Sequence, residues 1–533
     1  MLQIITWKKK VKNNTAVYTP KKYVSDQDYN QLISYFNKNL INKVLALINE
    51  NSIKGIVLEN NHKVFASSDF CKSYSLFYRL ENNKLSLSDS VNNLSKNLSL
   101  EILRSDFEVE LMMSGYMSEN KTVFQEIYQL RCGEYLFYNK NKGILKTSKY
   151  FSYLREQKEI VGNKKSNKLK LDRILNKIFS KIIEQSNKHK VVVTLSGGWD
   201  SRLIIAKLHS LGCRNLIAVT YGPKNNEEAI IARKVCERLK LDWKYVELDG
   251  SDYRKFFLSK KRKEYWLSCD FFSCLPNNQD YLVMSKLIKE CFLDKNSIIL
   301  NGQTGDFISG GHIPDNLLNG GESKKKLYEE IIKKNFSLWT NYLSDKNLIK
   351  IKKILEEKFM KLKEFRYSDA ELYEYWEFEE RQSKFILNGQ RIYDFLELKW
   401  ELPFWNYEFV NFWRNVPLSQ KKNAILYKEY LLKWDYKGLF TEIHRPRSGW
   451  SLMNALWIAS VSKVLKLFFP KEFQENFVHR VKYLDRLNHH YSSFGMKQFL
   501  KHSKQIRNPN SLYVLSWIKD IKQILNENTL LNK

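Results

Sequence analysis

The chain has 533 residues, too many for a single hydrophobic core, which predicts two or three domains. Hydrophobic residues make up 43% and charged residues 27%, a globular composition, and no apolar run is long enough to span a bilayer. The net charge of +30 suits a polyanionic partner, but the lysines are mixed with acids and asparagines, which favours solvated faces over nucleic-acid binding.

The first 150 residues have the pattern of short strands and turns with two helical stretches. Residues 54–69 form an apolar strand, an Asn-Asn-His turn and a second strand, and residues 133–151 repeat this hairpin pattern. A polar stretch at 155–168 then predicts a linker. The opening MLQIITWKKK lacks the order of a signal peptide, so we expect a cytoplasmic protein.

From Leu169 the pattern changes to helical spacing, and strands then alternate with helices. We predict strands at 191–195, 216–220, 243–248 and 297–300, with helices at about 201–211 and 227–241. Strands that alternate with helices indicate a parallel sheet with helices on its faces. The rest of the chain, from about 320, is predicted to be mostly helical.

Small polar residues follow the strand at 191–195 directly. Gly197 and Gly198 allow backbone N–H groups to approach a phosphate, and the following helix N-terminus favours an anion. Ser196 and Ser201 add hydroxyl donors, and Asp200 is explained if it holds Mg²⁺ that bridges phosphate oxygens. Neither a Gly-Lys-Ser/Thr ending nor G-x-G-x-x-G is present, which excludes the usual phosphate-binding loops.

The segment SGGWDS at 196–201 resembles the S-G-G-x-D-S signature of PP-loop ATP pyrophosphatases, which cleave ATP between the α and β phosphates. NGQTGDFISGGH at 301–312 resembles the asparagine synthetase segment S-G-E-G-x-D-E-x-x-G-G-Y, with matches at Gly302, Asp306, Gly310 and Gly311. LPFWNYEFVNFW at 402–413 and HRPRSGW at 444–450 resemble two further segments of that family. These segments occur in the family's order over about 170–450.

This resemblance implies a set of site residues. Asp200 and Asp306 would hold Mg²⁺, which agrees with two acids that follow two strand ends of one parallel sheet. The implied catalytic residues are Lys428, which would contact the phosphates, Gln303 and Asp306. The implied nucleotide-binding residues are Leu195, Ser196, Gly197, Gly198, Asp200, Ser201, Thr220, Tyr221, Gly222, Gly302 and Arg447.

The N-terminal part resembles the glutaminase domain of the same family at 63–78 and 114–138, which implies an N-terminal-nucleophile hydrolase sandwich with αββα layers. Such a glutaminase needs Cys directly after the initiator Met, because its free α-amino group is the base. Here residue 2 is Leu, and no Arg-His-Arg-Gly segment is visible. We therefore expect a degenerate domain that does not hydrolyse glutamine.

Two departures concern the synthetase site. Gln303 replaces the family's Glu and cannot act as a general acid or base, and Phe307 replaces an acid, so aspartate is a doubtful substrate. The preferred function is an ATP-dependent ligase that adenylates a carboxylate of a small molecule, sugar acid or peptide for attack by ammonia or an amine. Two alternatives stay open: a PP-loop enzyme that modifies tRNA, which suits the +30 charge, and a non-catalytic ATP-binding scaffold.

The predicted organisation is a glutaminase-like domain at 1–155, a PP-loop α/β domain at 165–450 and a helical extension at 451–533. A homodimer is compatible with this organisation. The amphipathic stretch 457–470 fits a core-facing helix better than a membrane surface. Seven scattered cysteines predict neither a disulfide framework nor a zinc site.

Overall fold

The computed structural model describes residues 2–20, 24–95, 103–156, 162–186, 189–224, 226–318, 324–362, 367–444, 490–508 and 510–531. Arg447, the 444–450 segment beyond residue 444, and the amphipathic stretch 457–470 lie outside these residues. Within the described ranges, no helix combines the length and the apolar character needed to cross a membrane.

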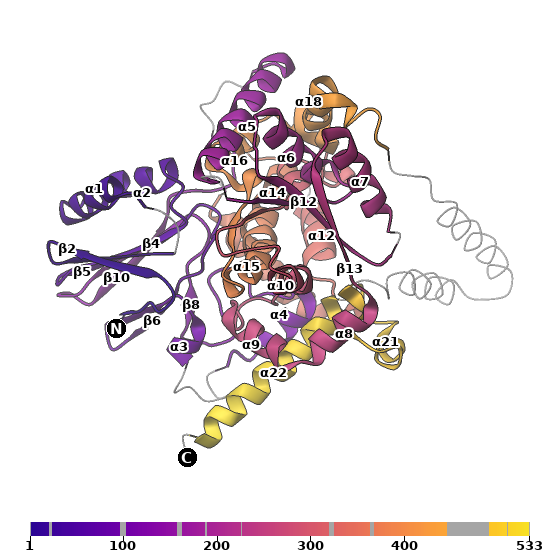
Figure 1. Ribbon diagram of the computed structural model, residues 1–533. Helices are drawn as coiled ribbons and strands as arrows, with labels where there is room; N and C mark the ends of the chain where they lie inside the picture. The colour runs from indigo at the N-terminus through magenta and orange to yellow at the C-terminus, as the bar shows by residue number, and fades with distance from the viewer. Residues whose placement is uncertain are drawn as a thin grey trace.

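The first 150 residues build two β-sheets that pack face to face, at the left of Figure 1. The smaller sheet has the order β1-β7-β6-β8 and the larger β10-β9-β5-β4-β3-β2. Both predicted hairpins are confirmed, since β4 pairs with β5 and β9 pairs with β10, each antiparallel. The strands are β1 (Leu2–Gln3), β2 (Lys8–Lys12), β3 (Thr15–Thr19), β4 (Gly55–Glu59), β5 (Lys63–Ser68), β6 (Phe77–Glu81), β7 (Lys84–Ser88), β8 (Tyr128–Gln129), β9 (Glu134–Asn139) and β10 (Ile144–Lys149).

Helices cover the outer faces of both sheets. α1 (Asp26–Asn37) and α2 (Ile41–Glu50) pack on the larger sheet through an apolar core that includes Phe36, Val44 and Phe65. A second core, with Trp7 and Leu136 among its members, lies between the sheets. α3 (Val91–Ser95) contacts β6 and β7 of the smaller sheet. The αββα layering expected from the sequence is therefore present.

The larger part of the chain is organised around a five-stranded parallel sheet of order β13-β12-β11-β14-β15. Its strands are β11 (Val191–Thr194), β12 (Leu216–Gly222), β13 (Asp242–Glu247), β14 (Ile298–Leu300) and β15 (Lys399–Glu401). Val191, Val192 and Val193 are completely buried, because the central strand is covered on both faces and its sequence is a continuous apolar run. The predicted parallel α/β fold is confirmed, with β15 as an additional strand.

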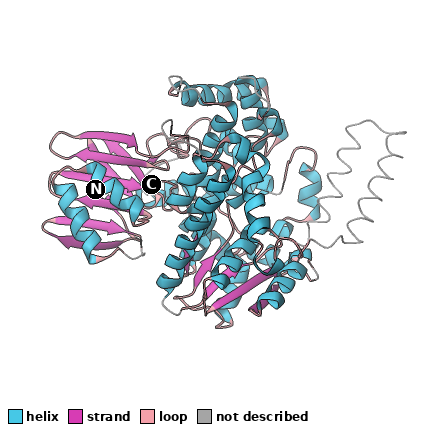
Figure 2. Ribbon diagram, turned by 90° about the horizontal axis from the view of Figure 1, so that it is seen from above, coloured by secondary structure: helices cyan, strands magenta, loops and turns pink. Residues whose placement is uncertain are grey.

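Helices surround this sheet, and Figure 2 shows how strongly they predominate over strands in this part of the molecule. The α-helices up to β15 are α5 (Lys164–Ser186), α6 (Trp199–Ser210), α7 (Glu227–Leu239), α8 (Gly250–Leu258), α9 (Lys260–Ser268), α10 (Tyr281–Lys289), α11 (Gly305–Ile308), α12 (Lys324–Asn335), α13 (Asp345–Met360), α14 (Asp369–Trp376) and α15 (Arg391–Phe395). After β15 come α16 (Tyr407–Arg414), α17 (Leu418–Lys421), α18 (Ile425–Trp434), α21 (Met496–His502) and α22 (Asn510–Leu531).

Short helical segments of other types connect these elements. η4 (Glu377–Ile386) is π-helical and continues α14, and the 3₁₀ segments are η2 (Asp315–Leu317), η3 (Thr340–Tyr342), η5 (Leu387–Gln390), η6 (Pro403–Trp405), η7 (Lys422–Ala424), η8 (Tyr436–Gly438) and η9 (His490–Ser493).

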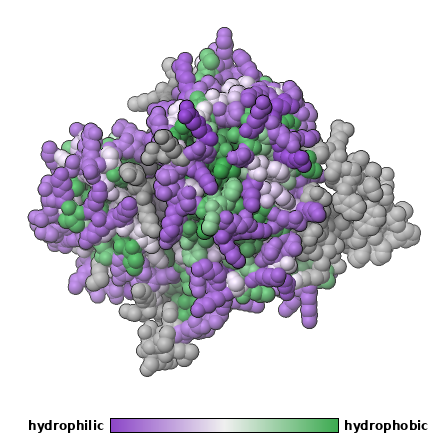
Figure 3. Space-filling model, in the orientation of Figure 1, coloured by the Kyte–Doolittle hydropathy of each residue, from purple (hydrophilic) through white to green (hydrophobic). Residues whose placement is uncertain are grey.

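The chain's two halves are joined by more than the linker. α4 (Phe107–Ser114) contacts the C-terminal helix α22, at the bottom of Figure 1. Met117 and Val123 then donate backbone hydrogen bonds to Ser273 and Phe272. On the face seen in Figure 3, hydrophilic residues cover most of the described surface. This agrees with the expectation that the lysines lie on solvated faces.

Candidate active site

The glycine-rich segment after β11 is a tight loop that ends at the N-terminus of α6. The hydroxyl of Ser201 accepts a hydrogen bond from the backbone N–H of Ser196 at 3.1 Å, and Gly198 donates to the Ser196 hydroxyl at 3.2 Å. A Cβ atom on Gly197 would lie 2.8 Å from Ile231 Cδ1, so a side chain there would displace the Ile231 methyl group. Gly198 is the N-cap residue of α6 and has no side chain of its own that could cap the helix, so the first turn of α6 can face an anion.

Asp200 and Asp306 come together where β11 and β14 end. The backbone N–H of Asp306 donates to Oδ2 of Asp200 at 3.0 Å, and the Tyr427 hydroxyl donates to its Oδ1 at 2.7 Å. A Cβ atom on Gly305 would lie 2.6 Å from Asp200 Cγ, and one on Gly302 would lie 2.8 Å from the Ser201 nitrogen. Glycine at 302 and 305 therefore lets the two loops approach closely enough to bring both acids to one edge of the sheet.

The two carboxyl groups differ in their electrostatic surroundings. Burial raises the pKa of Asp200 to about 7, the negative charge of Asp306 adds to the rise, and the Tyr427 hydrogen bond opposes it. Burial also acts to raise the pKa of Asp306, but the hydrogen bond and charge of His312 outweigh it, and the pKa is lowered overall. A cation between the two acids would remove the repulsion that raises the pKa of Asp200.

The donor set suits a hard cation such as Mg²⁺, because Asp200 and Asp306 offer only oxygen ligands. Within the described residues, no group of three or more His, Cys, Asp or Glu side chains gathers as a complete metal site. Mg²⁺ ordinarily retains waters and phosphate oxygens beside one or two carboxylates, so this pair fits the metal of a metal–nucleotide complex better than a permanent structural ion.

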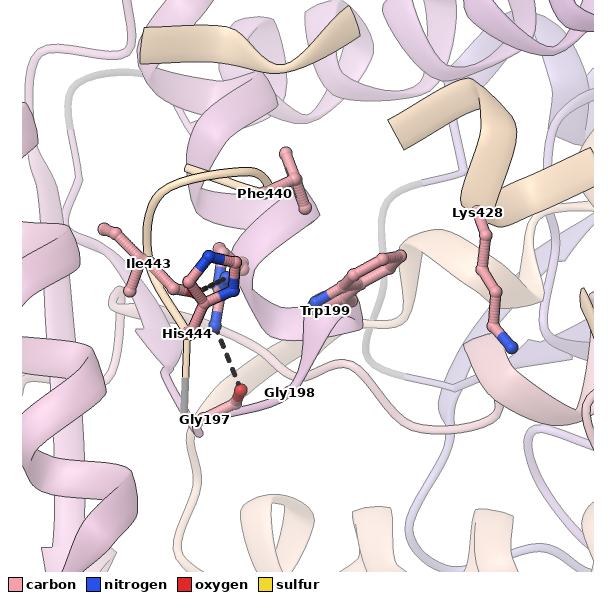
Figure 4. A pocket seen from close by; sticks show the side chains of 8 residues that line it. Gly197, Gly198, Trp199, Lys428, Phe440, Ile443 and His444 are labelled. Atoms are coloured by element: carbon pink, nitrogen blue, oxygen red, sulfur yellow. Dashed lines mark hydrogen bonds between the residues drawn. The ribbon is translucent and has the colours of Figure 1, made fainter. Parts of the chain in front are cut away.

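A cavity of about 330 Å³ lies beside the glycine loop (Figure 4). It is lined by Gly197, Gly198, Trp199, Arg202, Lys428, Phe440, Ile443 and His444. Lys428 is exposed, and among the described residues its amine makes no ion pair. The Trp199 ring meets the edge of Phe440 at a centroid distance of 6.0 Å, which gives the cavity an apolar wall. A free cation and open backbone N–H groups around one cavity favour an anionic ligand.

Arg202 is the structural support of this cavity. It is almost completely buried, and its guanidinium donates to the carbonyls of Gly197, Leu439 and Ile443 at 3.1, 2.7 and 2.9 Å. The side chain thereby ties the loop to the segment after α18.

The polar groups of the predicted nucleotide-binding residues at the end of β12 are hydrogen-bonded to other residues of the protein. The Thr220 hydroxyl donates to the Leu195 carbonyl at 2.8 Å, and the Tyr221 hydroxyl donates to Asp280. The Gly222 carbonyl accepts a hydrogen bond from Tyr245 at 2.8 Å. Nucleotide contacts from Thr220 and Tyr221 would therefore come from their backbone atoms.

Gln303 belongs to a chain of amides. Its Oε1 accepts a hydrogen bond from Nε2 of Gln390 at 2.8 Å, and its backbone N–H donates to Asn301 at 3.2 Å. Phe307, the other departure from the family's motif, is completely buried, with its ring 5.8 Å from that of Tyr153. Neither position offers a group that exchanges protons near neutral pH.

Thr304 sits between Gln303 and Asp306 in a left-handed conformation, with φ of 76°. This conformation is rare for a β-branched residue and costs roughly 1–3 kcal/mol. The Thr304 hydroxyl donates to Gln382 and accepts from Trp405, both at 3.1 Å. These two bonds hold the strained residue in place and fix the direction of the chain toward Asp306.

Several site residues were not found from the sequence. Trp199, Phe440, Ile443 and His444 line the cavity, Tyr427 binds Asp200, and His312 binds Asp306. Tyr427 precedes Lys428 directly and His312 ends a motif already singled out, so position in the chain was an available signal for these two.

The family model described as asparagine synthase matches residues 184–498, which is more than half of the chain. A search of curated proteins found no match. Among solved structures, 28 chains match, and one is an NH3-dependent NAD synthetase from Campylobacter jejuni in complex with a nitrate ion. It is 20% identical, the match covers 39% of this chain and 93% of that chain, and the TM-score is 0.21.

Proposed function

Because this chain belongs to the asparagine synthase family of ATP-dependent amide-forming ligases, we propose that it adenylates a carboxylate and joins it to nitrogen. A carboxylate oxygen attacks the α phosphorus of ATP, and the bond from that phosphorus to the bridging oxygen breaks to release pyrophosphate. The nitrogen lone pair of ammonia or an amine then attacks the acyl carbon, AMP leaves, and the nitrogen loses a proton. The observation that carries the proposal is the contact between Asp200 and Asp306 beside the glycine loop.

The chain's own residues have distinct roles in this scheme. The backbone N–H of Gly197 and the first turn of α6 bind the β and γ phosphates, and Lys428 offsets the charge that develops on the leaving pyrophosphate. Asp200 and Asp306 would hold Mg²⁺, which when bound supplies further neutralisation of that charge. Closely spaced donors of this kind favour the transition state, in which the leaving group carries more charge than in bound ATP.

The Gln303 position, where the family has a Glu, is occupied by uncharged amides. Gln303 and Gln390 form an amide pair that neither takes nor gives a proton. Gln303 and Gln390 therefore do not deprotonate the nitrogen nucleophile. The carboxylate substrate is proposed to be a small molecule, a sugar acid or a peptide side chain rather than aspartate.

Glutamine is not the proposed nitrogen source. Leu2 lies in β1, in register with Leu87, at the position where the family's glutaminases need a thiol. Cys71 cannot replace that thiol, because burial and the nearby Asp69 raise the pKa of its thiol well above its usual range. The N-terminal sandwich is then a packing partner of the synthetase part, and nitrogen comes from free ammonia or a substrate amine.

The products test this proposal. Phosphorus NMR of a reaction with ATP, Mg²⁺, ammonium and a panel of carboxylates should show AMP and pyrophosphate in equal amounts, and omission of the carboxylate should prevent both. Formation of ADP and phosphate instead would contradict adenylation. Binding of ATP without any turnover across the panel would favour the non-catalytic scaffold.

A further inference from the structure

The carboxylate of Asp306 has a fixed orientation although 65% of its side chain is exposed. Its Oδ1 accepts the backbone N–H of Phe307 at 2.8 Å, and its Oδ2 lies 3.0 Å from Nε2 of His312. A carboxylate only accepts at this distance, so Nε2 of His312 carries the proton and donates. Each oxygen has further lone pairs, and the exposed side chain leaves room for a cation beside them.

The other side of the His312 ring faces a buried acid. Its Nδ1 lies 3.6 Å from Oε1 of Glu377, a carboxylate with no solvent exposure. This separation is longer than a hydrogen bond, so Glu377 lies beside the ring without a direct hydrogen bond to it. The ring of Phe307 packs against the imidazole at a centroid distance of 5.8 Å. The imidazole therefore lies between a buried acid and the exposed acid of the candidate metal site.

Glu377 starts η4, the π-helical segment, and is fixed by its own helix. Its Oε1 accepts hydrogen bonds from Arg381 at 3.0 Å and from Gln382 at 3.1 Å. Gln382 is also the residue that receives the Thr304 hydroxyl bond. π-Helical turns are rare and occur often at functional sites, and this one places Glu377 beside His312 and hydrogen-bonds to the strained Thr304.

The opposite face of η4 is anchored to the N-terminal sandwich. Glu380 accepts hydrogen bonds from Lys358 at 2.9 Å and Lys384 at 2.6 Å, and Lys384 also donates to the Met117 carbonyl at 3.0 Å. Glu379 pairs with Lys149 at the end of β10. The η4 side chains of Glu379, Glu380 and Lys384 are nearly completely buried, so the segment that carries Glu377 has little freedom to move.

From this arrangement we propose that His312, packed between Glu377 and Asp306, is a positioning residue that orients the Asp306 carboxylate for the Mg²⁺ of the nucleotide complex. The inference rests on the proposed role of Asp306 as a metal ligand. Outer residues that hydrogen-bond to a metal's ligands fix their orientation before the metal arrives, and their loss ordinarily costs about 10- to 100-fold in metal affinity or activity. His312 does not touch the metal or the substrate itself in this proposal.

Metal binding tests the proposal without any need for catalysis. Mn²⁺ is titrated into the full chain in the presence of a non-hydrolysable ATP analogue, and free Mn²⁺ is followed by electron paramagnetic resonance. We expect His312→Ala to weaken Mn²⁺ binding about 10-fold or more. His312→Gln keeps an N–H donor toward Asp306 and should recover most of the affinity. Asp306→Asn should lose the site, and Glu377→Gln should fall between wild type and His312→Ala.

His209→Ala is the matched control, because His209 is also half-buried and makes two hydrogen bonds, to Tyr436 at 2.9 Å and to the Leu239 carbonyl at 3.0 Å, at the far end of α6. It should leave Mn²⁺ affinity unchanged. Equal Mn²⁺ affinity for His312→Ala and wild type would overturn the proposal, and so would an equal loss in His312→Gln and His312→Ala. The same holds if the wild-type chain binds no Mn²⁺ with the analogue.

This experiment separates the two proposals. If wild type binds Mn²⁺ through Asp306 and His312 as expected but forms no AMP with any carboxylate, the positioning role stands and the ligase proposal fails.

Discussion

The hydroxyl of Tyr427 donates a hydrogen bond to Oδ1 of Asp200 at 2.7 Å, and this bond joins α18 to the first turn of α6. The two residues are 227 positions apart in the chain. Lys428, the next residue, lines the cavity beside the glycine loop. The Tyr427–Asp200 contact therefore sets both a carboxylate of the candidate metal pair and the position of the candidate catalytic lysine.

Tyr427→Phe tests this contact. A hydrogen bond to a charged group contributes about 1.5–3 kcal/mol, so its loss should reduce ATP-dependent product formation roughly 10- to 100-fold. Tyr430→Phe is the control, because Tyr430 lies on the same helix and donates an equivalent bond, also of 2.7 Å, to Asp172 outside the site. Initial rates at saturating substrate compare the two variants, and equal effects would show that the Tyr427 bond only supports the fold.

Lys428→Ala should lower turnover by orders of magnitude while the affinity for ATP changes less. A cation that faces developing charge contributes more in the transition state than in the ground state. Lys433→Ala, an exposed lysine of α18 that does not line the cavity, should leave both quantities near wild type. Isothermal titration with an ATP analogue and steady-state rates give the comparison. A loss of affinity as large as the loss of turnover would make Lys428 a ground-state phosphate contact.

The N-terminal sandwich should show no glutaminase activity. The purified chain, incubated with labelled glutamine, should release no labelled glutamate, whereas ammonium should support amide formation. The reason is chemical: Cys71 is held as an unreactive thiol, and Leu2 offers no nucleophile. Labelled glutamate above the level of a heat-inactivated sample would overturn this account of the domain.

The same sandwich should contribute a pH-dependent part of the stability. Burial acts to raise the pKa of Glu119, but Lys358, Arg131 and Lys384 outweigh it, so the pKa lies well below its ordinary value of 4.5. The ionised Glu119 carboxylate therefore stabilises the folded chain fully at pH values above about 4.5, the pKa of the unfolded chain. This stabilisation is lost as the pH falls from there toward the lower pKa of the folded chain. Glu119→Gln removes one of the acids that pair with Lys358, which keeps Glu380, and should destabilise the protein by about 1.5–3 kcal/mol at pH 7.

Urea unfolding of wild type and Glu119→Gln at a series of pH values measures this contribution. The difference between the two should shrink as the pH falls below about 4. Glu126→Gln is the control, because Glu126 is 53% exposed in its pair with Arg79 and should contribute no more than about 1 kcal/mol. A difference that stays constant with pH would mean that charge on Glu119 is not what stabilises the interface.

Local patterns were sufficient to predict the framework of the fold. The apolar run at 191–195 and the helical spacing from Leu169 are properties of consecutive residues, and both elements are present. The helix α5 begins at Lys164, however, so the end of the linker predicted at 155–168 is wrong. The meeting of Asp200 and Asp306 was also predictable, because acids that follow parallel strands share one edge of the sheet. β15 was missed because Lys399–Glu401 is only three residues long and includes two charges.

The remaining features depend on tertiary contacts that no local pattern encodes. His312 and Glu377 are 65 positions apart and meet only because the tertiary fold brings η4 next to the 301–312 segment. The left-handed conformation of Thr304 contradicts the preference of a β-branched residue and is imposed by Gln382 and Trp405. Arg447 stays a prediction, since it lies outside the described residues.

The exchange of radiolabelled pyrophosphate into ATP, measured across a panel of carboxylates, tests the central claim most directly. A carboxylate that forms an acyl adenylate should drive this exchange in the absence of any nucleophile. Asp200→Asn and Asp306→Asn should each abolish it, because an amide is a poorer ligand for Mg²⁺, while their circular dichroism spectra and melting temperatures stay those of wild type. Near-normal exchange by either variant at ordinary Mg²⁺ concentrations, or exchange that proceeds equally well without any carboxylate, would contradict the account.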